Sequence, residues 1–309
     1  MFIVDHGFSS AKYLYKTLFG KIRSSYRISH RAGDLLYKGN NYEIGDEALL
    51  RTGSLYIKTV EELIETYPMF VACCAKAAGI SYDTDLVVGL PYDFWKEEQD
   101  KSFQEKENEI NKLQDSLKSI TLDNSDYRFD NVSVLPQGLG CIKTFLNQNT
   151  VTSGNLLMID IGFNTVIFTL YSVERKKILY GKTFYKRGVY DMTVNILAPE
   201  IAKIFPGKTF TPAEINYIIE TRKLQKGFEN IDITRQIQAA TTEYTKSLLK
   251  MIKDDLKEGF GAYNFSTVVF AGGGARLISE VTDTSGIDVK ILANPEYANC
   301  YGFALATRQ

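Results

Sequence analysis

Two stretches of the chain share one pattern, in which an apolar run ends in Asp-x-Gly and returns through small polar residues. The first lies between Phe2 and Lys12 and turns after Asp5, and the second spans residues 156–170 and turns after Asp160. Apolar runs joined by a short glycine-containing turn predict β-hairpins. One such stretch fits an ordinary hairpin with a polar tip. Because there are two, we predict a duplicated unit that holds a ligand between its copies.

A glycine-rich turn follows a third apolar run. Residues 267–271 lead into Gly272, Gly273 and Gly274, and a helix is predicted to start directly after them. Glycines let the backbone approach a ligand closely, and a helix start favours an anion. The pattern therefore predicts a place where a nucleotide lies against the backbone.

Hydrophobic spacing predicts the remaining elements. Ile57, Val60, Ile64 and Tyr67 recur at helical spacing, and Pro68 is expected to open a further helix. We predict short strand-like pieces in the polar region 24–50. Strands are expected at 85–90, 127–135 and 179–185, mostly helical structure at 209–256 and a closing helix at 297–307.

Composition narrows the range of functions. The chain has 309 residues, enough for two domains, and 36 basic against 37 acidic side chains. Without a long basic run, direct binding of the monomer to DNA is disfavoured. Its four cysteines, Cys73, Cys74, Cys141 and Cys300, lack C-x-x-C spacing, which argues against zinc and indicates buried thiols in a reducing cytoplasm. We see no signal peptide and no apolar stretch long enough to span a membrane.

The order of the motifs resembles one superfamily. An Asp-x-Gly hairpin, Pro136-Gln-Gly138, a second hairpin, Gly188-x-x-Asp-x-Thr193 and three glycines follow one another as in the actin, sugar-kinase and heat-shock-chaperone ATPases. Gly89-Leu-Pro91 and residues 294–302 resemble the ParM-like bacterial and archaeal actins. This resemblance implies an α/β fold of two ribonuclease-H-like, actin-type domains around a nucleotide cleft, each with a small inserted subdomain.

The resemblance also implies domain boundaries. Residues 1–149 would form domain I, with a small subdomain at about 24–56 and the C-terminal helix, 295–309, packed back on it. Residues 150–294 would form domain II, with a helical outer subdomain at about 199–258.

Roles for individual residues follow from the same resemblance. Asp5 and Asp160 would hold Mg²⁺, largely through water, and Gln137 would orient the attacking water. Lys12 would neutralise phosphate charge. Gln137 also fits a helix-cap residue, and Lys12 also fits an exposed strand lysine. The other expected nucleotide contacts are Gly7, Phe8, Ser9, Ser10, Gly162, Phe163, Asn164, Thr165, Gly188, Asp191, Glu214, Lys223, Gly272, Gly273, Gly274 and Arg276.

Some features leave alternatives open. Arg222 precedes Lys223, and the sequence does not decide between these two cations. Phe8 and Ile167 replace residues that relatives often use near the phosphates, which bears on the hydrolysis rate more than on nucleotide binding. The charged region 94–118 fits either a filament contact face or a solvated amphipathic helix.

The leading hypothesis is a cytoplasmic ATPase, or GTPase, that polymerises with itself and segregates a plasmid or similar DNA. It would reach that DNA through an adaptor protein bound at a centromere-like site. The alternatives are a small-molecule kinase of the same superfamily and an actin-like scaffold with little turnover. A P-loop enzyme is excluded because no G-x-x-x-x-G-K-[ST] occurs.

Overall fold

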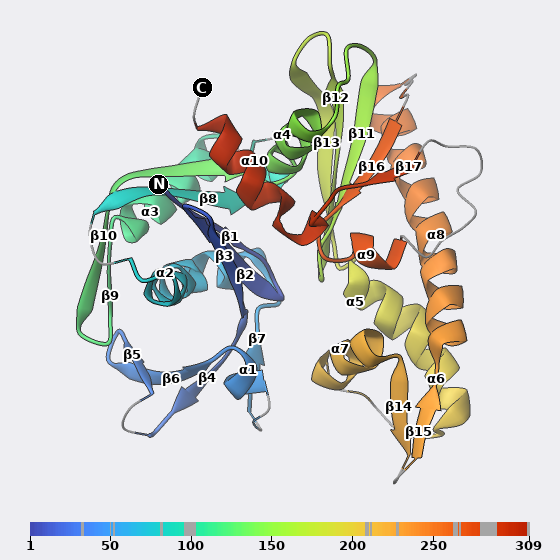
Figure 1. Cartoon of the computed structure of the whole chain (residues 1–309), viewed down its shortest axis with the longest axis horizontal. Coiled ribbons are helices and arrows are strands. Elements are labelled where there is room, and N and C mark those ends of the chain that lie inside the picture. Colours follow the sequence, from blue (N-terminus) through green and yellow to red (C-terminus); the bar gives the residue numbers. More distant parts are fainter. Residues whose placement is uncertain are drawn as a thin grey trace. The chain divides into compact units, whose positions relative to one another are not determined.

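The structure is a computed structural model (Figure 1). It describes residues 1–31, 34–49, 51, 53–80, 83–95, 103–207, 210, 212–226, 229–261, 265, 267–278 and 289–307. The chain divides into two compact units, and each is described by itself. Unit 1 comprises residues 1–152, 181–183 and 292–309, and unit 2 comprises 153–180 and 184–291.

Unit 1 is built on a six-stranded sheet in the order β3-β2-β1-β8-β10-β9. Its first hairpin is antiparallel and places Asp5 opposite Lys12, whereas β8 runs parallel to both β1 and β10. The bounds are β1 Phe2–His6, β2 Ser10–Tyr15, β3 Leu18–Arg23, β8 Thr84–Leu90, β9 Ser119–Leu122 and β10 Ser125–Pro136.

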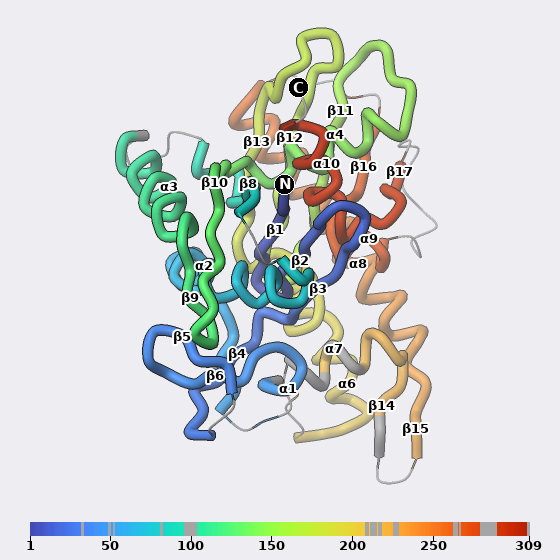
Figure 2. Tube along the Cα trace, turned by 60° about the vertical axis from the view of Figure 1, so that its left-hand side comes forward, coloured from blue at the N-terminus to red at the C-terminus, as the bar shows by residue number. Residues whose placement is uncertain are grey.

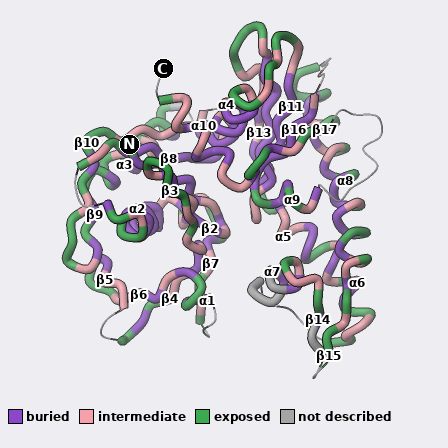
Figure 3. Tube along the Cα trace, viewed as in Figure 1, coloured by how far each residue is buried: buried purple, intermediate pink, exposed green. Residues whose placement is uncertain are grey.

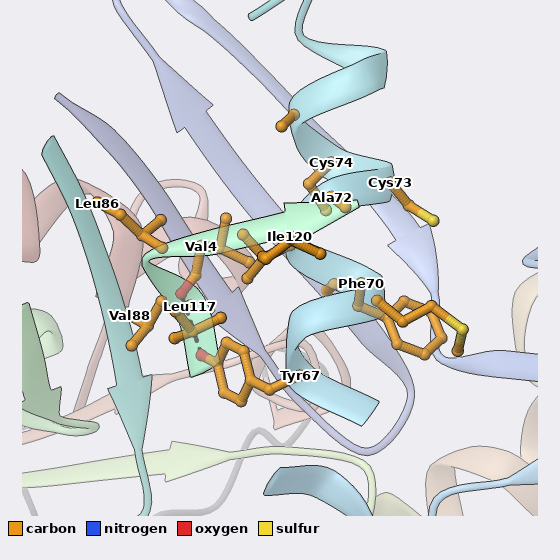
Figure 4. Close-up of a cluster of buried hydrophobic side chains, with 14 of the residues drawn as sticks. Val4, Tyr67, Phe70, Ala72, Cys73, Cys74, Leu86, Val88, Leu117 and Ile120 are labelled. Atoms are coloured by element: carbon orange, nitrogen blue, oxygen red, sulfur yellow. Dashed lines mark hydrogen bonds between the residues drawn. The ribbon is translucent and has the colours of Figure 1, made fainter. Parts of the chain in front are cut away.

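The central helix of unit 1 is α2, Val60–Ala77, which starts at the N-cap Thr59 and buries a continuous run from Thr66 to Ala75. The expectation that Pro68 opens a helix is wrong, because α2 continues through it. An interior proline costs a helix about 3 kcal/mol. Packing outweighs that cost here, since apolar side chains on both sides of Pro68, including Leu63, Tyr67 and Phe70, lie in one core. Figure 4 shows Tyr67 and Phe70 in this core.

The helices α4, Leu139–Gln148, and α10, Ala298–Ala306, pack closely together. Gly140 and Gly302 permit this approach, because a Cβ on Gly302 would collide with the Gly140 carbonyl. Asn299 Oδ1 accepts the Gly138 N–H at 3.0 Å, and the Thr144 hydroxyl donates to the Ala298 carbonyl at 2.7 Å. The last described helix therefore completes unit 1.

A separate four-stranded sheet in unit 1 has the order β5-β6-β4-β7. Its strands are β4 Ser25–Ser29, β5 Leu35–Tyr37, β6 Asn40–Ile44 and β7 Leu55–Tyr56. The other helices of unit 1 are α1 Asp46–Leu49, η1 Tyr92–Trp95, α3 Phe103–Leu117 and η3 Pro295–Tyr297. Residues 96–102, part of the charged region considered above, lie outside the described residues.

Unit 2 repeats the arrangement of the first sheet, with the order β13-β12-β11-β16-β17. An antiparallel hairpin again lies beside parallel strands, so the duplication predicted from the two hairpins is confirmed. The strands are β11 Asn155–Ile161, β12 Thr165–Ser172, β13 Lys177–Tyr185, β16 Thr267–Ala271 and β17 Val289–Ile291. The helices are α5 Val189–Asp191, η2 Met192–Leu197, α6 Ala198–Ile204, α7 Pro212–Thr221, α8 Thr234–Phe260 and α9 Ala275–Ile278.

The region 209–256 is mostly helical, as predicted, but it also contains two short strands that the sequence pattern did not indicate. An antiparallel hairpin, β14 Lys223–Lys226 and β15 Glu229–Asp232, separates α7 from α8 (Figure 2). Arg222 ends α7 in a left-handed conformation at φ 59°, and the following Leu224 turns into the core. Along α8, Ile237, Ala240, Tyr244, Leu248 and Ile252 are buried at helical spacing. Figure 3 shows buried and exposed stretches following one another along this helix.

None of the helices in the described part of the chain combines the length and apolar character that a membrane crossing needs.

Candidate functional site

Each unit contains one set of candidate residues, which we call a half-site. In unit 1, Asp5 lies near the end of β1 and is only 4% exposed. The Gln137 side chain donates from Nε2 to Asp5 Oδ1 at 2.6 Å, although the two residues are 132 positions apart. The backbone N–H of Gln137 donates to the Leu90 carbonyl at 2.8 Å. The ends of β1, β8 and β10 thus hold this carboxylate and amide together.

The turn of the first hairpin is closed by hydrogen bonds. The Gly7 N–H donates to the Ser10 carbonyl at 3.0 Å, and the Ser24 hydroxyl donates to the Gly7 carbonyl at 2.6 Å. A Cβ on Gly7 would lie 3.3 Å from Lys12 Nζ, so this ammonium group extends over the turn. Phe8 is buried in the hydrophobic core of unit 1, which leaves its backbone as the part that could contact a ligand.

Tyr67 supports this half-site from α2 and was not identified from the sequence. The ladder between β1 and β8 ends at Val4 and Val88. Beyond it, the Tyr67 hydroxyl accepts the N–H groups of His6 and Gly89, both at 3.2 Å. Its oxygen also lies 2.9 Å from the Gly89 carbonyl and 3.2 Å from that of Val4 (Figure 4).

One hydroxyl therefore replaces the strand–strand hydrogen bonds where β1 and β8 separate beside Asp5. Burial and the nearby Asp5 charge raise the pKa of Tyr67 well above its ordinary value, so it stays protonated. Gly89 has no room for a side chain, because a Cβ would lie 2.8 Å from the Phe303 ring and 3.2 Å from Asp5 Oδ1. Helical spacing places Tyr67 on a buried face, but no sequence signal shows where its hydroxyl binds.

In unit 2, Asp160 lies near the end of β11 and is 8% exposed. The hairpin turn after it contacts the segment 187–190 along the backbone. The Val189 N–H donates to the Gly162 carbonyl at 3.1 Å, and the Tyr190 N–H donates to the Phe163 carbonyl at 2.8 Å. Gly188 fits only without a side chain, since a Cβ would collide with those same two carbonyl oxygens.

The glycine-rich turn meets the same hairpin. The Gly274 N–H donates to the Ile161 carbonyl at 2.9 Å. Gly272 has φ +80°, and a Cβ on it would collide with Asp160 Oδ1 and the Ile161 carbonyl. Unit 2 thus brings three separate glycine-containing segments together at the hairpin turn that follows Asp160.

Two hydrogen bonds and a buried tyrosine hold the supporting segments of this half-site. The Arg187 N–H donates to the Asn164 carbonyl at 3.2 Å, and the Gly162 N–H donates to the Thr165 carbonyl at 2.8 Å. The Tyr244 hydroxyl, on α8, donates to the Arg187 carbonyl at 2.6 Å, and burial raises the pKa of that tyrosine.

Three further predicted nucleotide contacts, Asp191, Lys223 and Arg276, can be located in unit 2. Asp191 accepts hydrogen bonds from the side chains of Arg187 and Asn195. Lys223 starts β14, where it faces solvent and pairs with Asp232 across the hairpin. Arg276 is exposed on α9, and the side chain of Glu214 lies outside the described residues.

Two family models match the sequence. The model for the N-terminal domain of actin-like proteins matches residues 4–140, and the model for the C-terminal part of the archaeal actin homologue MreB-like matches residues 158–283. Both describe actin homologues, and between them they include both Asp-x-Gly turns. The chain belongs to the actin-like proteins.

Solved structures agree with this assignment. The archaeal actin homologue Ta0583 is 17% identical to this actin-like protein, with a TM-score of 0.78 over all of both chains. ParM from Clostridium botulinum, in a 15-stranded filament, is 16% identical, with a TM-score of 0.75 over 100% of this chain and 99% of that one. ParM from Bacillus thuringiensis with ATP is 12% identical, with a TM-score of 0.66 over 98% and 96%.

At these identities the likeness establishes the actin-type fold alone. Ta0583 has also been solved in complex with ADP, at 16% identity and a TM-score of 0.74 over all of both chains. A search of curated proteins gives no match.

Proposed function

We propose that this actin-like protein binds Mg-ATP with its two half-sites, hydrolyses it and polymerises with copies of itself. The observation that carries the proposal is the convergence of three glycine-containing segments at the hairpin turn that follows Asp160. A matching hairpin in unit 1 holds Asp5 against Gln137. Related structures hold ATP or ADP, and one is a filament, which supports the same reading.

We also propose domain boundaries for this activity. Domain I would be residues 1–149, with the small subdomain at about 24–56 and the C-terminal helix added to it. Domain II would be 150–294, with its outer subdomain at about 199–258. One nucleotide bound by both domains would couple its own hydrolysis to their movement.

The residues present fit a magnesium ion bound with a nucleotide. Mg²⁺ is usually held by one or two carboxylates together with phosphate oxygens and water. Asp5 and Asp160 are nearly buried carboxylates, and each lies against a glycine, Gly89 and Gly272, whose missing side chain leaves Oδ1 uncovered on that side. When bound, the ion would neutralise charge on the transferring phosphate.

The contact between Gln137 and Asp5 defines what the glutamine can do. A carboxylate only accepts hydrogen bonds, so the amide nitrogen of Gln137 must face Asp5. The amide oxygen is then the atom available to accept a hydrogen bond from water. An amide is a weak base, so we propose that Gln137 orients the attacking water rather than deprotonating it. This contact favours turnover over a scaffold without hydrolysis.

The backbone turns would bind the phosphates. Backbone N–H groups and small hydroxyls in such turns stabilise developing negative charge. We assign this role to Gly7, Ser9, Ser10, Lys12, Gly162, Asn164, Thr165, Gly188 and the turn 272–274. The N–H groups of Gly7, Gly162 and Gly274 are bonded within the turns, so these glycines would contribute close approach of the backbone. We assign four further residues to the nucleoside end of the ligand on the resemblance alone, and they are Asp191, Glu214, Lys223 and Arg276.

We further propose that polymerisation segregates a plasmid or similar DNA in the cytoplasm. With 36 basic and 37 acidic side chains, the chain has no charge excess that would attract DNA directly. A DNA-binding adaptor protein would make that link.

Two variants test the site. Asp160→Ala should lose Mg-dependent hydrolysis, whereas Asp130→Ala, an exposed carboxylate of β10, should not. Gln137→Ala should keep nucleotide affinity while hydrolysis slows about 100-fold, the scale of the loss when one positioned hydrogen-bonding group is removed from an active site. Gln148→Ala, exposed near the end of α4, is the matched control. The rate of phosphate release with ATP and with GTP measures hydrolysis by each variant. Wild-type turnover in Asp160→Ala would contradict the site assignment.

Assembly is tested by sedimentation and light scattering with ATP, ADP and a non-hydrolysable analogue. We expect polymer with the triphosphates and disassembly after hydrolysis, so Gln137→Ala should form longer-lived polymer. A protein that stays monomeric in all three states across a wide concentration range would exclude a filament.

A further inference from the structure

The outer strand of the unit 1 sheet exposes two large apolar side chains. Leu18 is 48% exposed and Phe19 is 50% exposed, and both lie on β3, the first strand in the order of that sheet. Lys16 and Lys21 flank them and are also exposed. We name residues 16–21 the basic edge.

An exposed edge strand with large apolar residues promotes association unless another group covers it. The basic edge is held in a defined conformation. The Phe19 ring lies 5.1 Å from that of Tyr297 at 63°, and Lys21 Nζ donates to Glu296 Oε1 at 2.6 Å. It therefore presents Leu18 and part of the Phe19 ring on a supported surface.

Unit 2 contains a groove of complementary character. It has a volume of about 370 Å³ and lies between Phe184 of β13 and one face of α8. The α8 residues recur at helical spacing, and they are Ser247, Lys250, Met251, Asp254, Asp255 and Glu258. We name this the acidic groove, because three carboxylates and one lysine give it a net charge of 1 − 3 = −2.

Contacts within unit 2 hold the side chains of the acidic groove in place. The Phe184 ring stacks on that of Phe168 at 5.4 Å and 25°. The Tyr180 hydroxyl donates to Asp255 Oδ1 at 2.9 Å. Phe184 and Met251 are half-buried, so the groove offers apolar surface between its charged side chains.

We propose that the basic edge of one copy docks in the acidic groove of a second copy. This inference rests on the proposed self-assembly and names its contact surface. Leu18 and Phe19 would cover Phe184 and Met251, while Lys16 would face the carboxylates, since Lys21 pairs with Glu296. A stable interface usually buries about 1,600 Å², so these residues are the centre of a larger contact.

The two surfaces are different, which determines the form of the assembly. When an edge meets a groove, the pair retains one free groove and one free edge. Such a heterologous contact adds further copies and gives a ring if its rotation closes or a filament if it does not.

Two variants interrupt the contact from opposite sides. The edge variant is Leu18→Ser with Phe19→Ser, and the groove variant is Asp254→Lys with Glu258→Lys. All four side chains are exposed, so both variants should fold and bind nucleotide. Each alone should raise the protein concentration needed for sedimentable polymer at least 10-fold. The matched controls are Leu55→Ser, another exposed apolar residue, and Glu243→Lys, an exposed acid elsewhere on α8.

Mixing the variants gives the decisive result. The edge variant keeps its groove and the groove variant keeps its edge, so an equimolar mixture should form dimers but no polymer. Size-exclusion chromatography with light scattering in the non-hydrolysable analogue would detect them. If both variants polymerise like wild type, or the mixture stays monomeric, this contact is wrong while the filament stands. If wild-type protein never polymerises, the filament proposal fails and this contact fails with it.

Discussion

Acid should destabilise this protein through one histidine. His6 is fully buried, next to the rings of Tyr67 at 4.9 Å and Phe70 at 4.5 Å. Neither ring nitrogen has a hydrogen-bond partner among the described residues. Burial, together with the nearby charge of Lys12, lowers the pKa of His6 from 6.5 to about 3. The folded protein therefore keeps this imidazole neutral.

The sign and size of the effect follow from linkage. Below pH 6.5 the unfolded chain binds a proton at this position, whereas the folded protein does not until the pH approaches 3. Stability is therefore complete above pH 6.5 and falls as the pH drops from there toward 3. At about 1.4 kcal/mol per pH unit, the loss from His6 between pH 7 and pH 5 is about 2 kcal/mol.

Urea unfolding from pH 8 to pH 4.5 tests this, with His6→Leu and His30→Gln as a pair. His30, the other histidine in the chain, is exposed. From pH 7 to pH 5, wild type and His30→Gln should each lose about 2 kcal/mol more stability than His6→Leu. Parallel pH profiles for wild type and His6→Leu would show that the imidazole titrates normally and refute the reasoning.

Two further predictions concern the supports of the half-sites. Tyr67→Phe leaves the N–H groups of His6 and Gly89 without their acceptor, so urea unfolding should show a loss of about 2–4 kcal/mol. Tyr171→Phe, also buried, is the control, and equal effects would mean that the Tyr67 hydroxyl has no special role. Gly188→Ala places a methyl group against two carbonyl oxygens and should lower the thermal midpoint, whereas Gly273→Ala meets no atom within 4 Å and should not. Equal midpoints would contradict the described backbone contact.

The local patterns of the sequence predict much of this fold. Both Asp-x-Gly hairpins form where the apolar runs place them, because strand pairing across a short turn depends on neighbouring residues. The convergence of Gly188 and the turn 272–274 on the second hairpin depends on residues far apart in the chain. The resemblance to actin-like proteins indicated that convergence, and periodicity alone did not.

The errors have physical causes. Pro68 fits a helix start locally, but the core on both sides of it keeps α2 continuous. The hairpin β14–β15 was missed because the pattern from 209 to 256 looks helical, while the left-handed backbone of Arg222 interrupts it. Tyr67 follows helical spacing like any core residue. The hydrogen bonds of its hydroxyl depend on where β1 and β8 end, which helical spacing does not show.

The packing of Gly302 against Gly140 affects how the chain folds during synthesis. Unit 1 contains the first strands to leave the ribosome, yet its α4 surface stays uncovered until α10 has been made. At roughly 5–20 residues per second, the intervening stretch takes on the order of ten seconds or more to synthesise. The second sheet can form within that interval. The unit that is started first is thus finished last, and until then its exposed helix face is a natural target for chaperones.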